Sequence, residues 1–181
     1  MINSLKKSLW KQFGASIDML KNAILLWPEE YWNTKKKFFY MAYHCLVFLD
    51  YYLTIPPEYF SSPLAFTLSE PGDIPEDAID DVVPDRIYTK DELLACLQST
   101  REKCHQLIAG LTEEKLKQRW IGESAPIYLA LSGRDALTYS VLEILLYNMR
   151  HVQHHAAQLN LLLRQETNHA PDYISQAEDD L

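Results

Sequence analysis

The sequence predicts an all-α protein, a four-helix bundle that forms a single domain. Four long segments carry apolar residues at helical spacing, and almost no segment alternates apolar and polar residues as a strand would. The 181 residues are 48% hydrophobic and 12% aromatic, enough for a substantial core. Long amphipathic helices without a sheet bury their apolar faces against one another, which favours the bundle.

The first two helices are expected before residue 54. The first covers about residues 3–26, where apolar residues recur every three or four positions from Leu5 to Ile24. It ends before Pro28, and the sequence PEEYWN then forms a turn. The second helix covers about residues 35–53, with a continuous apolar row along one face.

A long connection, residues 54–88, separates the second helix from the third. Six of the nine prolines fall between positions 56 and 84, so no regular element is expected there. About 35 residues allow a crossover along the bundle, with the second and third helices parallel. From Glu70 to Asp85 the connection carries seven acids and no base. It is interpreted either as a solvated surface loop or as a lid over one end of the bundle.

The third helix has clear end signals. It begins at the sequence TKDE, a capping box from Thr89 to Glu92, and ends at Gly110. A short helix, TEEKLKQRW, and a loop around Pro126 follow.

The fourth helix is expected to start near Asp135 and to run to about Gln165. The bundle domain therefore covers residues 1–166. Residues 167–181 form a C-terminal tail that is expected to be acidic and frayed.

Composition excludes several classes of partner. The net charge of −8 argues against nucleic acid and against an anionic membrane surface. No apolar run approaches the roughly 18 residues of a membrane span, and the N-terminal residues lack a signal-peptide core. Cys45, Cys96 and Cys104 form no CxxC pair and are interpreted as reduced, ordinary small hydrophobes of a cytoplasmic protein.

The sequence NMRHVQHHAAQLN, residues 148–160, places three histidines within the fourth helix. At about 100° per residue, His151 and His155 lie some 40° apart on one face, one turn from each other. His154 projects about 60° from His151 on the other side. The pair His151 and His155 therefore has the spacing that lets two imidazoles bind one metal ion without bending the helix.

A third ligand has to come from another helix, and His44 is the best candidate because it faces inward or nearly so. Asp50 lies about 120° from His44 around the second helix, and Glu143 lies about 80° from His151. His105 and His169 have no partner at chelating spacing. The alternative is that the inward histidines are core residues satisfied by hydrogen bonds alone.

These residues resemble the DinB/YfiT-like metalloenzyme superfamily, which includes bacterial thiol-dependent transferases. The resemblance covers about residues 3–165 and depends on His44, on the sequence HVQHHAAQLN and on four helices with a long second connection. It implies an up-down-down-up bundle and a divalent metal ion held by His44, His151 and His155.

The resemblance further implies that the metal activates a low-molecular-weight thiol, which attacks an electrophilic substrate. Zinc suits three histidines best, and nickel, iron and manganese are admissible. Metal-dependent hydrolysis and a non-catalytic stress-response module are the alternatives. Asn148 either orients a bound ligand or satisfies the backbone, and a homodimer is expected.

Overall fold

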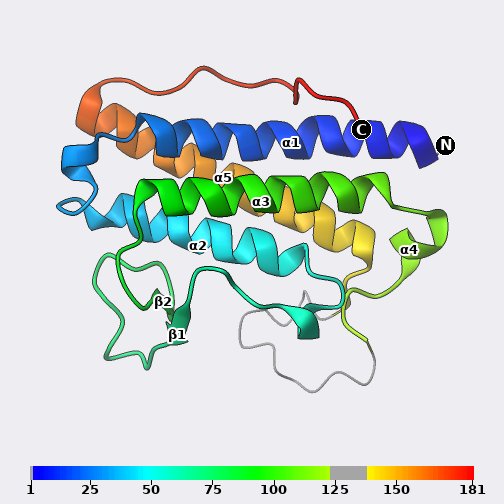
Figure 1. The fold of residues 1–181 in the computed structure, drawn as a ribbon, viewed down its shortest axis with the longest axis horizontal. Coiled ribbons are helices and arrows are strands. Elements are labelled where there is room, and N and C mark those ends of the chain that lie inside the picture. Colours follow the sequence, from blue (N-terminus) through cyan, green and yellow to red (C-terminus); the bar gives the residue numbers. More distant parts are fainter. Residues whose placement is uncertain (1, 123–137) are drawn as a thin grey trace.

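The computed structural model describes residues 2–122 and 138–181, which are mostly helical. Four long helices lie side by side in Figure 1: α1 (Ile2–Leu26), α2 (Lys36–Tyr52), α3 (Lys90–Ala109) and α5 (Val141–Thr167). The packed pairs are α1 with α5, α5 with α2, α2 with α3, and α3 with α1. The helices therefore form a closed ring, and the predicted all-α class is confirmed.

Aromatic side chains fill much of the core between these helices. The fully buried ones include Trp10, Phe13, Trp27, Phe38, Phe39 and Trp120. Trp27, directly after α1, stacks on Phe38 of α2 with ring centroids 4.1 Å apart. The indole N–H of Trp32, which follows the short 3₁₀ helix η1 (Glu29–Tyr31), donates to the carbonyl of Tyr88 at 2.8 Å. This contact ties the α1–α2 turn to the start of α3.

Side-chain caps determine where two of the long helices begin. Thr89 caps α3 through the predicted capping box, and Gly110 ends that helix. Ser140 caps α5 in the same way, because its hydroxyl accepts from the N–H of Glu143. The predicted start near Asp135 and the loop around Pro126 lie outside the described residues, but residues 138–140 precede the helix. Helix α5 thus begins later than apolar periodicity indicated, at its cap.

The connection between α2 and α3 contains some regular structure, contrary to the prediction. After the 3₁₀ helix η2 (Pro57–Tyr59), strands β1 (Phe66–Leu68) and β2 (Val82–Pro84) pair antiparallel. Strand β2 packs against α2, and Val82 is buried. The connection is therefore partly anchored to the bundle, because some of its apolar side chains, such as Leu64 and Val82, are buried.

The C-terminal tail is ordered, so the prediction of a frayed segment is wrong. It runs back along α1, as Figure 1 shows, and the N–H of Ala177 donates to the carbonyl of Lys11 at 2.9 Å. The guanidinium group of Arg101 on α3 binds both Asp18 of α1 and Asp179 of the tail. Gly14 allows this close approach, since a Cβ atom there would lie 2.8 Å from the Cβ of Ala177.

Within the described ranges, no helix combines the length and the apolar character that a membrane span requires.

Candidate metal centre

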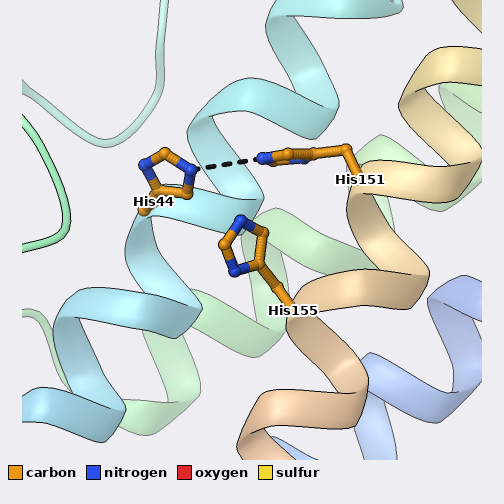
Figure 2. A group of neighbouring side chains, drawn as sticks. All are labelled: His44, His151 and His155. Atoms are coloured by element: carbon orange, nitrogen blue, oxygen red, sulfur yellow. Dashed lines mark hydrogen bonds between the residues drawn. The ribbon is translucent and has the colours of Figure 1, made fainter.

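Helices α2 and α5 bring the three predicted histidines together. His44 lies on α2, and His151 and His155 lie one turn apart on the facing side of α5. In Figure 2 the three rings converge on one point between the two helices. One ligand nitrogen from each ring lies within 4.8 Å of the others, so the group can hold a metal ion.

The spacing of the nitrogens fits a shared ion. Nε2 of His44 lies 3.2 Å from Nε2 of His151. Two nitrogens bound to one zinc ion at about 2.0–2.1 Å in tetrahedral geometry lie roughly 3.3 Å apart. The ring centroid of His155 lies 4.8 Å from that of His44 and 4.5 Å from that of His151. The side chains are therefore close to the positions that coordination requires.

Burial keeps two of these imidazoles neutral. Desolvation, with smaller contributions from the neighbouring histidines, lowers the pKa of His151 to about 2. The same causes lower the pKa of His155 to about 4, although Gln158 and Asp80 act in the opposite direction. Metal binding requires the unprotonated ring nitrogen. At neutral pH both rings are therefore already in the protonation state that a metal ion requires.

Gln158 orients the ring of His155. Its Oε1 lies 2.8 Å from Nδ1 of His155 and accepts the ring proton in this assignment. The lone pair then resides on Nε2, the nitrogen that faces the other two rings in Figure 2. Metal-bound histidines commonly donate a hydrogen bond from the N–H of their second ring nitrogen in this way. The sequence analysis missed Gln158, although its spacing of three residues from His155 puts both on one helix face.

The two other rings have different surroundings at Nδ1. Oδ2 of Asp80 lies 3.0 Å from Nδ1 of His44, at ion-pair distance but not aligned for a hydrogen bond. Nδ1 of His151 is buried and has no hydrogen-bond partner within the described part of the chain. Asp80 was also missed, because nothing in the local sequence links a residue of the long connection to His44.

The remaining predicted residues lie outside the cluster. His154 is exposed, and its ring contacts that of His155 from outside the cluster, edge to face with centroids 5.1 Å apart. Asn148 donates from Nδ2 to the carbonyl of Leu49 at 3.0 Å, so it has the backbone contact that was one of its two expected roles. The ring of His105 contacts Trp10 edge to face, and His169 is exposed.

Aromatic rings line the cluster on the α2 side. The ring centroid of Phe48 lies 4.6 Å from that of His44, and the centroid of Tyr52 lies 5.9 Å from that of His151. Burial raises the pKa of the Tyr52 hydroxyl, and its hydrogen bond with Tyr147 raises it further. Tyr52 is therefore protonated at neutral pH and offers no base.

None of the three cysteines is a nucleophile for this site. Cys45, Cys96 and Cys104 are buried and unpaired. Burial raises the pKa of Cys96 to about 11 and raises those of Cys45 and Cys104 as well. Their thiols remain protonated at neutral pH, as expected for core residues.

Three imidazoles leave at least one coordination position of a divalent ion for another ligand, which is typical of catalytic sites. A comparison with protein families matches residues 10–159 to the DinB superfamily. Neither the curated proteins nor the solved structures include a significant match. The matched range contains all three histidines and spans the ring of four helices that positions them, and the chain therefore belongs to the DinB superfamily.

Proposed function

We propose that the chain is a divalent-metal-dependent enzyme that transfers a low-molecular-weight thiol to an electrophile. The observation that carries the proposal is the convergence of His44, His151 and His155 on one point. A bound divalent ion would supply Lewis-acid chemistry and lower the pKa of a coordinated thiol. The nucleophile comes from outside the chain, because the three cysteines are buried and protonated.

The surrounding residues prepare the site for that chemistry. Gln158 holds His155 with Nε2 toward the other rings, and burial, which lowers the pKa values of His151 and His155, keeps these two imidazoles from taking up protons. The buried rings of Phe48 and Tyr52 exclude water from the α2 side of the cluster. Apolar surroundings strengthen the electrostatic effect of a bound cation. A thiol and an apolar electrophile are the substrates that fit this environment best.

The order and direction of the four helices also support the proposal. The up-down-down-up order, with a crossover between α2 and α3, is part of the proposal. In Figure 1 the ribbons of α2 and α3 both start at the end where α1 and α5 finish, which supports it.

Metal content of protein purified without an affinity tag tests the first half of the proposal. We expect one divalent ion per chain, with zinc preferred over nickel, iron and manganese. Alanine substitution of each cluster histidine is expected to weaken binding strongly. His154→Ala is the matched control, because it removes a neighbouring but exposed imidazole. Loss of binding in His154→Ala but not in His151→Ala would contradict the assignment.

Turnover of a model electrophile tests the second half. Metal-loaded protein is assayed with 1-chloro-2,4-dinitrobenzene and a panel of small thiols, beside the His155→Ala variant. The proposal expects turnover that needs both the metal and a thiol. Metal-dependent turnover of ester substrates without any thiol would identify a hydrolase instead. No turnover across the panel by a metal-loaded protein would favour a non-catalytic metal-binding module.

A further inference from the structure

Asp80 is the acid of the long connection whose carboxylate meets the histidine cluster, as far as the described residues show. Its Oδ2 lies 3.0 Å from Nδ1 of His44, the ring nitrogen that faces away from the other two histidines. Its Oδ1 accepts from the backbone N–H of Val82 at 3.1 Å. One carboxylate thus joins the start of β2 to a candidate metal ligand on α2.

The backbone that follows Asp80 fixes the position of this carboxylate. Residues 82–84 pair with β1, and the carbonyl of Asp81 accepts from the N–H of Ser69 at 2.9 Å. The side chain of Val82 is buried, which anchors the strand to the bundle. The side chains of His44 and Asp80 are 11% and 29% exposed, so water competes little for the contact.

Through its negative charge, a carboxylate beside one nitrogen of a neutral imidazole favours the tautomer with the proton on that nitrogen, even where, as at His44, the pair is not aligned for a hydrogen bond. An ionised carboxylate only accepts hydrogen bonds, whereas each nitrogen of a neutral imidazole is either a donor or an acceptor. Asp80 therefore favours the proton on Nδ1 of His44 and leaves the lone pair on Nε2. That lone pair lies 3.2 Å from Nε2 of His151, on the side where the three rings converge.

We propose that Asp80 is a positioning residue that holds His44 in the tautomer and orientation needed to bind a divalent ion through Nε2. This inference rests on the proposed metal centre but not on its thiol chemistry. His151 completes the arrangement, since its Nδ1, which has no hydrogen-bond partner among the described residues, can take up the proton that its own Nε2 gives up. The acidic connection then has a definite role at the metal centre.

The substitution Asp80→Asn distinguishes this role from simple packing. The N–H of Val82 donates to Oδ1, so the oxygen of the introduced carboxamide would stay there and its NH₂ group would face Nδ1 of His44. An NH₂ group can only donate to Nδ1, which favours an unprotonated Nδ1 and therefore the ring proton on Nε2. The isosteric variant is therefore expected to harm metal binding more than Asp80→Ala, which only removes the acceptor.

Zinc affinity, measured by competition with a chromophoric chelator, is the first readout. Removing a carboxylate that orients a metal-bound histidine commonly weakens binding by roughly 10–100-fold. We expect Asp80→Ala near the lower limit and Asp80→Asn near the upper one. Asp81→Asn is the matched control, because it removes the same charge at the next residue, and it is expected to bind as the wild type does. Equal affinity in Asp80→Asn and wild type would overturn the inference.

Nitrogen-15 chemical shifts of the imidazoles in metal-free protein give a readout that does not require metal or activity. The wild type is expected to show the His44 proton on Nδ1, and Asp80→Asn is expected to show it on Nε2. A wild-type His44 protonated on Nε2 would refute the inference even if the protein binds zinc. Failure of thiol transfer, with both readouts as expected, would refute the proposed enzyme activity and leave this inference standing.

Discussion

Acid is expected to destabilise the metal-free bundle through two of its buried imidazoles. Burial lowers the pKa of His151 from 6.5 to about 2 and that of His155 from 6.5 to about 4. The unfolded chain therefore binds more protons than the folded one between pH 6.5 and the folded-state values. The free energy of unfolding is fully retained above that window and falls as the pH drops through 6.5.

The size of the effect follows from these values. At about pH 5 the solution is roughly 1.5 units below the ordinary pKa of histidine, and each unit corresponds to about 1.36 kcal/mol. Each imidazole then lowers the free energy of unfolding by about 2 kcal/mol, and the two together lower it by about 4 kcal/mol. The comparison stops near pH 5 so that carboxyl groups with lowered pKa values, such as Glu92 at about 2, do not contribute to it. The stabilising effect of those groups is lost only below about pH 4.5.

Urea unfolding followed by circular dichroism, with a chelator present, measures this loss between about pH 8 and pH 5. The double variant His151→Leu/His155→Leu lacks both groups and is expected to lose about 4 kcal/mol less than the wild type over the same range. His154→Gln removes an exposed imidazole and is expected to behave as the wild type does. An equal loss in wild type and double variant would show that the buried imidazoles are protonated in the folded state.

Three further outcomes are expected. Chelation lowers the melting temperature by roughly 5–10 °C, if the free metal was about 100 times its dissociation constant, while the far-ultraviolet spectrum stays helical; an unfolded apo protein would contradict this. In an isolated helix, Gly14→Ala would raise stability by up to about 1 kcal/mol. In this structure it is expected to displace the tail and to speed the hydrogen exchange of the tail amides, and adding Ala177→Gly is expected to restore their protection. Ser140→Ala removes the cap of α5 and costs about 1 kcal/mol in urea unfolding, and no change would assign the cap no energetic role.

Local signals predicted the helices and the histidine cluster well. The capped start of α3 at Thr89 depends on a few neighbouring residues and was predicted directly, whereas the similar cap of α5 at Ser140 was missed. The pair His151 and His155 is also local, because helical geometry alone puts both imidazoles on one face. His44 needed only the additional inference that its helix packs against theirs.

Features that depend on distant contacts could not be predicted in the same way. No pattern joins Asp80 to His44, because the contact depends on where β2 meets α2. The tail was predicted to be frayed because its residues are mostly polar, yet Arg101 and Lys11 bind its carboxylates and carbonyls. Gln158 is the exception, since its spacing from His155 was available in the sequence.

The route of the tail makes two opposite sides of the helical ring unequal. Where α1 meets α3, the tail contacts both helices through Lys11 and Arg101. Where α2 meets α5, the polar contacts include the hydrogen bond from Asn148 to Leu49 and the three histidines, which a bound ion would link directly. The tail thus links α1 and α3 within the chain itself, whereas the link between α2 and α5 would depend partly on an ion that can be removed. Loss of the metal ion would then loosen the packing of α2 against α5, while α1 and α3 would stay linked by the tail.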